Sequence, residues 1–267
     1  MRKFISRLYL AAVLLLLYLP IFYLIYYSFS SGNNMNSFAG FSLVHYRELL
    51  ADKNLLAIFL QTIGLALISG LLATIIGTGG ALGVYWLKNK KLKNATLVLN
   101  NILLVSPDVI IGASFLVLFT ALGISLSFVS VLLSHVAFSI PIVLLMVLPR
   151  LQQLDPSLVD AAQDLGASPS QVLSKVILPE LVPGIFSGLF MAMTYSLDDF
   201  AVTFFVTGNG FTTLSVEIYS RARQGISLEI NALSTLMVLV VLLFAGGYYA
   251  ISKKTGSDFG ENKGNLL

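Results

Sequence analysis

The chain has 267 residues, of which 57% are hydrophobic and only 11% are charged, and its mean hydropathy is +0.87. An average soluble domain carries about 25% charged residues, so this composition excludes an ordinary soluble domain and predicts an integral membrane protein. The lack of cysteine excludes disulfides, thiolate metal sites and cysteine nucleophiles. The net charge of +3 is less informative than the positions of the charges.

Six apolar runs are long enough to cross a bilayer about 30 Å thick, which takes about 18 or more residues. They cover about residues 6–28, 56–87, 97–121, 127–148, 184–206 and 231–252. The first is too long for a signal peptide and has no small-residue cleavage site, so we expect it to stay as a span. Such runs are helices rather than barrel strands. We therefore expect one all-α membrane domain over residues 1–267, with external loops at 29–54 and 207–230 and a polar tail.

Positively charged residues fall mainly on one side of the predicted membrane. With both termini in the cytoplasm, the cytoplasmic segments contain Arg2, Lys3, Arg7, Lys88, Lys90, Lys91, Lys93, Arg150, Lys175, Lys253, Lys254 and Lys263. The external segments contain Arg47, Lys53, Arg221 and Arg223. An excess of Lys and Arg marks the cytoplasmic side of bacterial membrane proteins, so we expect cytoplasmic termini and a cytoplasmic loop at 149–182.

Small residues recur at four-residue spacing in the second span, at Ser69, Ala73, Gly77 and Ala81. Such a stripe lets helix backbones approach closely in lipid, and Gly79 to Gly83 is a further GxxxG pair. The glycine cluster around Gly77 is not a nucleotide-binding loop, because no Gly-Lys-Ser/Thr follows it. We therefore expect these glycines to pack helices.

The loop at 149–182 has the signals of two short helices. Asp155-Pro156 supplies an N-cap and a proline at the first helical position, and Gly166 is suited to a left-handed C-cap. Ser168-Pro169-Ser170-Gln171 forms a capping box that starts a second helix, expected to run to Pro179. An ordinary helix on the membrane surface is the alternative, but Asp160 and Asp164 disfavour contact with anionic lipid. A docking element for a soluble partner fits better.

The same loop carries a family resemblance. Asp160-Ala161-Ala162-x3-Gly166-x9-Val176-x-Leu178-Pro179 resembles the EAA motif of ABC importer permeases, EAA-x3-G-x9-I-x-L-P. Asp160 replaces the usual Glu, Val176 replaces the usual Ile, and the spacing matches throughout. The resemblance extends over the whole chain and implies a type I importer permease with a cytoplasmic coupling helix pair, in the bacterial inner membrane.

The resemblance implies that residues 157–166 transmit ATP-driven closure of a cytoplasmic ATPase to the spans. The ATPase contacts would then involve Asp160, Ala161, Ala162, Gly166, Leu178 and Pro179. The chain itself has no phosphate-binding loop, so ATP-Mg is expected in the partner, and no cofactor, metal or catalytic residue is expected in this chain. The implied partners are a homologous second permease subunit, an ATPase dimer, an external binding protein and membrane lipid, with no nucleic acid.

Three carboxylates lie in or beside apolar runs, at Asp108, Asp198 and Asp199. A buried aspartate costs at least about 2.5–3.5 kcal/mol at a helix centre, and the spans offer no obvious internal Lys or Arg to offset it. Such carboxylates face a water-filled path, stay protonated or meet a cationic substrate. Asp108 has the alternative of capping a helix that restarts after Pro107.

Adjacent residues on a helix point about 100° apart, so Asp198 and Asp199 cannot both face one path squarely. We expect Asp198 to face the path and Asp199 to contact a helix. The nearby aromatic residues Phe115, Tyr195, Phe200 and Phe204 offer cation–π contacts or plain packing. We place Tyr195 with the three aspartates in the predicted substrate path.

A second resemblance concerns the substrate. The segments Ser106-Pro107-Asp108-Val109-Ile110, Asp164-Leu165-Gly166-Ala167-Ser168, Ser196-Leu197-Asp198-Asp199-Phe200 and Ser227-x-Glu229-Ile230-Asn231-Ala232-Leu233 are similar to the permeases of spermidine/putrescine importers. This resemblance implies a polyamine substrate, delivered by a polyamine-binding protein, whereas the residues alone indicate only a path for cations. Glu229, near the outer face, is then positioned to attract cations or is simply solvated.

Other functions remain open at this point. The cargo of such an importer could instead be anionic or neutral, such as sulfate, phosphate, molybdate or a sugar. The unpaired carboxylates argue against the anions, because they repel negative charge. An ATPase-independent cation carrier with Asp108 and Asp198 as a relay leaves the helix pair unexplained. A membrane-embedded enzyme has no motif to support it.

The two histidines do not indicate a further function. His135, beside Ser134 and Ser139, is expected to form hydrogen bonds between helices rather than relay protons, and no metal-like cluster surrounds it or His45.

Overall fold

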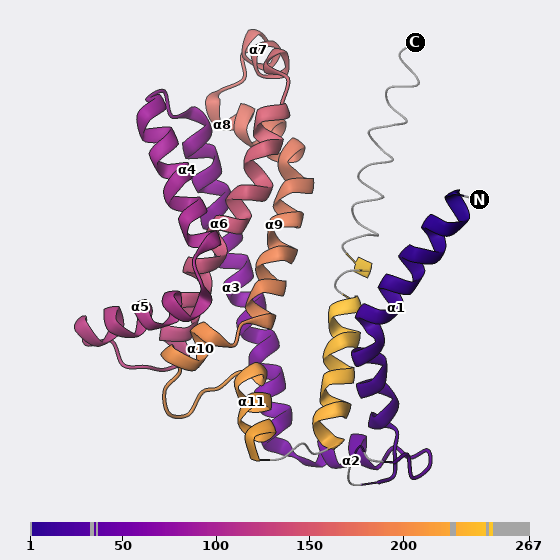
Figure 1. Cartoon of the computed structure of the whole chain (residues 1–267). Coiled ribbons are helices and arrows are strands. Elements are labelled where there is room, and N and C mark those ends of the chain that lie inside the picture. The colour runs from indigo at the N-terminus through magenta and orange to yellow at the C-terminus, as the bar shows by residue number, and fades with distance from the viewer. Residues whose placement is uncertain (1, 33–34, 36, 225–227, 244–245, 248–267) are drawn as a thin grey trace. The chain divides into compact units, whose positions relative to one another are not determined.

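The computed structural model describes residues 2–32, 35, 37–224, 228–243 and 246–247 (Figure 1). In these residues every regular element is helical, apart from one antiparallel bridge between Ser30 and Phe41. The helices are α1 (Arg2–Ser28), α2 (Val44–Ala51), α3 (Lys53–Trp86), α4 (Lys90–Val105), α5 (Asp108–Ala121), α6 (Phe128–Gln153), α7 (Pro156–Asp164), α8 (Pro169–Val172), the π-helical turn η1 (Leu173–Ile177), α9 (Leu178–Asp198), α10 (Ala201–Val206) and α11 (Leu214–Gln224). An apolar helix over Leu228–Leu243 follows them.

Four helical stretches in the described residues are long and apolar enough to cross a membrane, or five if the bent pair of α4 and α5 counts as one span. The span predicted over 97–121 falls on this bent pair, in which the chain turns by 107° between Val105 and Asp108, so a single unbroken helix does not cover it. Pro107 has no N–H to donate and disfavours helical backbone at the preceding residue. Ser106 accordingly has an extended ψ of 138°.

The other predicted spans need smaller corrections. The span predicted at 184–206 lies in a helical stretch that begins earlier, at Pro169, and is interrupted after Asp198 before α10 begins. Of the run predicted at 231–252, the described helix ends at Leu243, and residues 244–245 and 248–252 lie outside the described residues, as does the predicted polar tail. The all-helical membrane class is therefore confirmed, whereas the number of six spans is not.

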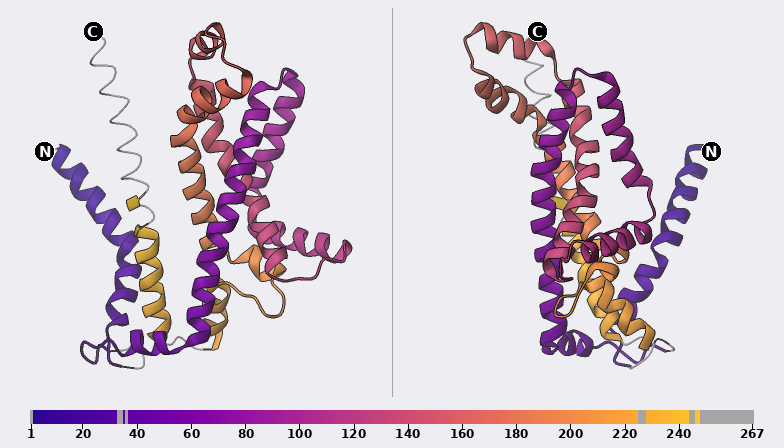
Figure 2. Two further views of the ribbon diagram at one scale, coloured as in Figure 1. Left: turned by 180° about the vertical axis from the view of Figure 1, so that it is seen from behind. Right: turned by 90° about the vertical axis from the view of Figure 1, so that its left-hand side faces the viewer.

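The chain divides into two compact units, one of residues 1–59 and 217–243 and one of residues 60–216 and 244–267. In the second unit α6 packs along α9 and against α4, while α5 packs on α10. Two views show α6 and α9 running alongside α3, with α5 crossing the end of α4 at a steep angle (Figure 2). Valines and leucines of α6 and α9 fill the core between them, including Val143, Val147, Leu151 and Leu181.

The predicted small-residue stripe on α3 packs as expected, but the GxxxG pair does not. Ser69, Ala73 and Ala81 are fully buried. A Cβ added to Gly77 would lie 2.7 Å from Val143 Cβ, which is closer than real side chains approach. Added Cβ atoms at Gly79 or Gly83 would meet nothing within 4 Å. The close contact between α3 and α6 therefore depends on Gly77.

The two short helices of the 149–182 loop are confirmed. Asp155 accepts from the Ser157 N–H at the start of α7, and Gly166 has the left-handed φ of +82° at its end. The capping box of Ser168 and Gln171 starts α8. The helix does not end at Pro179 as predicted, because α8 continues through η1 into α9 and Pro179 occupies the first turn of α9.

In the first unit, Arg221 of α11 forms ion pairs with three carboxylates. Its guanidinium lies 2.7 Å from Glu217, 3.0 Å from Asp52 and 3.4 Å from Glu229. The pKa of Asp52 lies below its usual range. The largest cause is the hydrogen bond from the backbone N–H of Leu55, followed by the Arg221 guanidinium, and the N–H of Asn54 adds to it. Glu229, which we expected either to attract cations or to be solvated, is thus paired with Arg221.

Candidate functional site: an acidic cavity at two helix breaks

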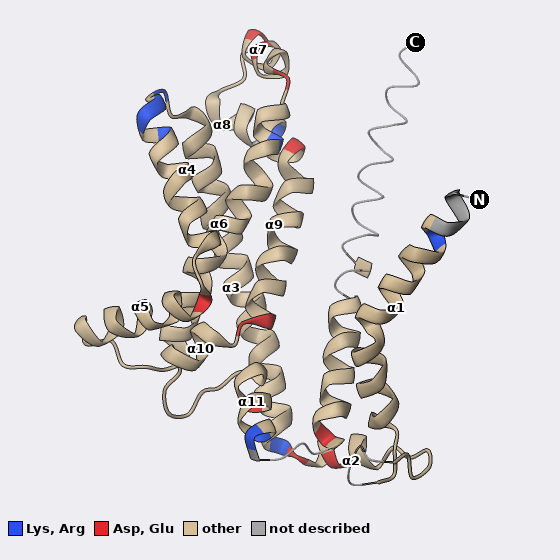
Figure 3. Cartoon of the chain, in the orientation of Figure 1, with Lys and Arg blue, Asp and Glu red and all other residues tan. Residues whose placement is uncertain are grey.

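A cavity of about 240 Å³ opens in the second unit where two helix breaks meet. It is lined by Asp108, Phe138, Tyr195, Asp198, Asp199, Phe200, Ala201 and Val202. One break separates α4 from α5 and the other separates α9 from α10. Acidic residues lie at both breaks, whereas basic residues gather at the turn between α3 and α4 (Figure 3). No Lys or Arg is among the cavity-lining residues.

Asp108 reaches the cavity because α5 restarts directly after Pro107. Asp108 is the first residue of α5, and its carboxylate forms no side-chain cap of that helix. The structure therefore does not show Asp108 as a side-chain cap of α5. α5 is held against α10 by close packing at Gly112, where an added Cβ would lie 3.0 Å from Val202 Cα. The exposed Asp108 carboxylate accepts a long hydrogen bond of 3.4 Å from the Tyr195 hydroxyl.

Asp198 and Asp199 occupy different surroundings at the second break. Asp198 ends α9 and is exposed toward the cavity. Asp199 has extended backbone, and its carboxylate accepts hydrogen bonds from the backbone N–H groups of Val202 and Thr203 at the start of α10. Its side chain is only 5% exposed and lies 3.4 Å from His135 Nε2. The carboxylate of Asp199 is thus used inside the protein.

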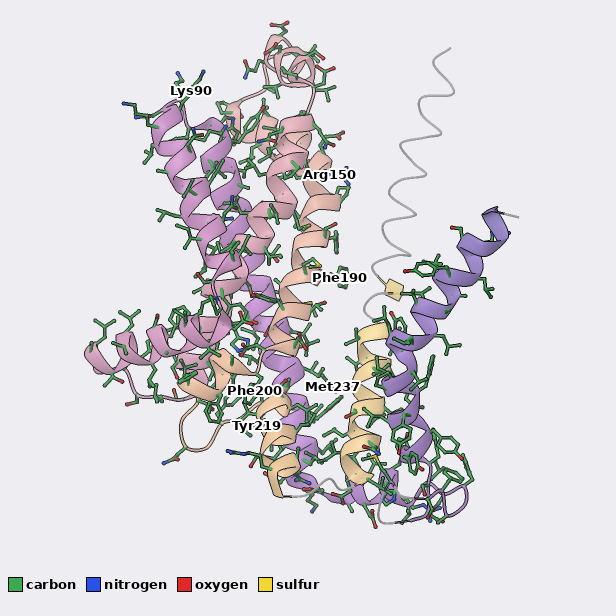
Figure 4. The ribbon with its side chains drawn as sticks, in the orientation of Figure 1. Lys90, Arg150, Phe190, Phe200, Tyr219 and Met237 are labelled. Atoms are coloured by element: carbon green, nitrogen blue, oxygen red, sulfur yellow. The ribbon has the colours of Figure 1, made fainter. Side chains whose placement is uncertain are left out.

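Of the four aromatic residues named from the sequence, two line the cavity, one packs in the core and Phe204 is 49% exposed. The Tyr195 ring meets the Phe138 ring edge-on at 5.1 Å, and Phe200 lies at the turn between α9 and α10 (Figure 4). Phe115 stacks on Phe119 in the core, and Phe204 is not among the lining residues. Phe138 was missed by sequence reasoning, because nothing in its apolar surroundings distinguishes it from the rest of α6.

His135 forms hydrogen bonds between helices, as predicted. It is fully buried on α6 and lies within hydrogen-bond distance of Ser196 on α9 and Thr203 on α10. Sequence reasoning missed these two hydroxyl partners. Ser196 lies three residues before Asp199 and Thr203 four residues after it. This spacing indicates a shared partner only once the helix break at Asp199 is known. In the described residues no group of three or more His, Cys, Asp or Glu side chains is arranged to hold a metal.

The residues predicted to contact an ATPase lie far from this cavity along the chain. On α7, Asp160 and Ala161 are exposed, and so is Gly166 after it, whereas Ala162 packs inward against the α6–α9 core. Leu178 and Pro179 belong to the first turn of α9. Sequence reasoning missed an apolar residue in this loop, since Leu165 is 89% exposed.

Comparisons with known proteins agree with this architecture. Residues 75–255 match the family described as binding-protein-dependent transport system inner membrane component. The spermidine/putrescine transport system permease protein PotC of Escherichia coli (strain K12) is 36% identical over 258 residues, covering 96% of this chain and 97% of PotC. The putrescine transport system permease protein PotI of the same strain is 36% identical over 228 residues, covering 83% and 81% of the two chains.

A solved structure supports the fold. The crystal structure of a bacterial ABC transporter involved in the import of the acidic polysaccharide alginate contains a chain with a TM-score of 0.72 and 18% identity, covering 94% of this chain and 98% of that chain. The resemblance to ABC importer permeases noted in the sequence is thus confirmed. The chain belongs to the family of binding-protein-dependent transport system inner membrane components, as a multi-pass permease of an ABC importer that has neither ATPase activity nor a cofactor of its own.

Proposed function

We propose that this chain is one of two permease subunits of an ATP-driven importer of polyamines, with Asp108 and Asp198 as the groups that meet the cation in the path. The observation that carries the proposal is a cavity lined by three aspartates and by no Lys or Arg, in which Asp108 and Asp198 are exposed. Carboxylates with no lining cation beside them attract cations and repel anions. The printed functions of PotC and PotI, at 36% identity, favour spermidine and putrescine as the cations.

In this proposal the path opens alternately to either side of the bacterial inner membrane, with both termini in the cytoplasm. An external polyamine-binding protein delivers substrate to the loops at 29–54 and 207–230. A cytoplasmic ATPase dimer contacts α7 through Asp160, Ala161 and Gly166, and Ala162 carries the movement to the core against which it packs. Leu178 and Pro179, in the first turn of α9, connect the loop to the helix that ends at Asp198.

The test is uptake of labelled spermidine and putrescine by cells lacking their own importer, with this chain, its companion permease, ATPase and binding protein co-expressed. Asp198→Asn is expected to abolish most uptake, because it removes the exposed cavity charge. Glu180→Gln is the matched control, since it removes one negative charge from the first turn of the same helix. The relative transport of spermidine and putrescine then identifies the preferred cargo.

Three outcomes would contradict the proposal or a part of it. If well-expressed wild type imports neither polyamine, the substrate is wrong. If uptake survives ATP depletion and collapses only when the membrane potential is removed, the chain works as a carrier rather than as part of an ATP-driven importer. Equal uptake by Asp198→Asn and wild type would remove Asp198 from the path.

A further inference from the structure

A chain of buried hydrogen bonds links four helices behind the acidic cavity. Ser69 of α3 donates to Ser196 Oγ of α9 at 3.1 Å. Ser196 Oγ lies 2.7 Å from His135 Nδ1 of α6, and His135 Nε2 lies 2.9 Å from Thr203 Oγ1 of α10. Thr203 in turn donates its hydroxyl to the Asp199 carboxylate at 2.7 Å. The chain therefore ends on the carboxylate at the second helix break.

This chain has a direction, because each hydroxyl has a single proton to donate. Thr203 gives its proton to Asp199, so it accepts from His135, and Nε2 of the imidazole carries a proton. In a neutral imidazole Nδ1 is then an acceptor, which takes the proton of Ser196. Ser196 accepts from Ser69 in turn. Every donor along the chain has a partner when His135 is neutral with its proton on Nε2.

We infer that His135 is a positioning residue that keeps the Asp199 carboxylate, only 5% exposed at the cavity wall, turned toward α10, so that two of the three lining aspartates are exposed to the cation. A buried carboxylate needs hydrogen bonds to stay charged without a cation, and Asp199 obtains them from α10 and through Thr203 from His135. Because Asp199 is anchored, the neighbouring Asp198 is directed into the cavity. The identity of the cation rests on the proposed function, whereas the anchoring does not.

The test compares His135→Leu with His135→Gln. Leucine has no polar atom, whereas the glutamine amide keeps one donor and one acceptor. His135→Leu removes the N–H that the Thr203 hydroxyl accepts, so it should change the half-saturating polyamine concentration several-fold. His135→Gln should stay close to wild type. Ser134→Ala is the control, because Ser134 is also buried on α6 and donates to the Ser130 carbonyl of its own helix.

A second readout does not depend on the cargo. The chain has no cysteine, so Asp198→Cys introduces a single thiol whose reaction rate with a cationic thiol reagent reports the access of position 198 to the cavity. In the assembled transporter we expect this rate to change several-fold when His135→Leu is added, and to stay unchanged with His135→Gln or Ser134→Ala. Thr203→Val and Thr203→Ser form a second pair, in case His135→Leu does not reach the membrane, and the valine variant should behave like His135→Leu.

The outcomes separate the two proposals. If the leucine and glutamine variants show the same uptake and the same thiol reactivity, and Thr203→Val matches Thr203→Ser, then the positioning role is wrong. If the reactivities differ as expected while wild type imports no polyamine, the positioning role holds and the proposed cargo fails.

Discussion

Asp198 and Asp199 are chemically identical neighbours whose roles are separated by one residue of extended backbone. The Asp199 carboxylate turns toward the N–H groups of α10, whereas Asp198 is exposed in the cavity that Asp108 also lines. The expectation that one aspartate contacts a helix while the other faces the cavity agrees with this geometry. Which of them meets substrate remains a prediction for the uptake experiment.

The ion pair between Asp52 and Arg221 lies outside the spans and is expected to stabilise the folded protein. Asp52→Asn keeps an acceptor for the Leu55 and Asn54 N–H groups but loses the ion pair with Arg221. We expect the substitution to lower the free energy of unfolding at pH 7 by about 0.5–1 kcal/mol, as for partly exposed ion pairs. Thermal unfolding of the purified protein measures the difference.

The pH dependence of that difference follows from the lowered pKa of Asp52. A group whose pKa is lower in the folded than in the unfolded state stabilises fully above its unfolded pKa, about 3.9 for aspartate, and loses this effect as the pH falls through the folded pKa. The gap between wild type and Asp52→Asn should therefore close on acidification. A gap that stays constant down to pH 3 would exclude a contribution from the charge.

At the scale of elements, helix packing depends on which glycine faces a neighbour. Gly77→Ala places a Cβ 2.7 Å from Val143 Cβ and 3.2 Å from the Ile140 carbonyl. Such overpacking costs about 1–3 kcal/mol, so we expect a lower unfolding temperature and less protein in the membrane. Gly79→Ala, two residues further on α3, meets open space and should be neutral or slightly stabilising. Equal effects of the two substitutions would contradict the packing role of Gly77.

The turn after α7 is a second element whose backbone requires glycine. Gly166 has a φ of +82°, which costs a residue with a Cβ about 1–2 kcal/mol, with asparagine tolerated best. Gly166→Ala should therefore displace the exposed end of α7 and weaken the stimulation of ATP hydrolysis by substrate-loaded binding protein. Gly166→Asn should retain most of it. If both variants couple normally, this turn plays no part in the proposed contact of α7 with an ATPase.

At the scale of the whole molecule, the distribution of Lys and Arg predicts which loops face the cytoplasm. The cysteine-free chain allows a direct test with single thiols at Ser37, in the loop at 29–54, and at Asn94, in the first turns of α4, both of which are exposed. A thiol reagent that cannot cross the inner membrane should label Ser37→Cys in cells whose inner membrane is intact and whose outer envelope admits the reagent. Asn94→Cys should be labelled only in inverted vesicles. The opposite pattern would reverse the predicted orientation.

Local signals in the sequence, such as apolar run length, capping residues and charge, are enough to predict the helical membrane class, the short helices α7 and α8 and the carboxylates at the ends of apolar segments. The tertiary structure decided where the helices break and which side chains meet. The bend at Pro107 and the end of α9 at Asp198 lie inside apolar runs that hydropathy reads as continuous. Asp108 lines the same cavity as Asp198, and His135 lies within hydrogen-bond distance of Thr203. Both pairs are far apart in the chain, and only helix packing decides such neighbours.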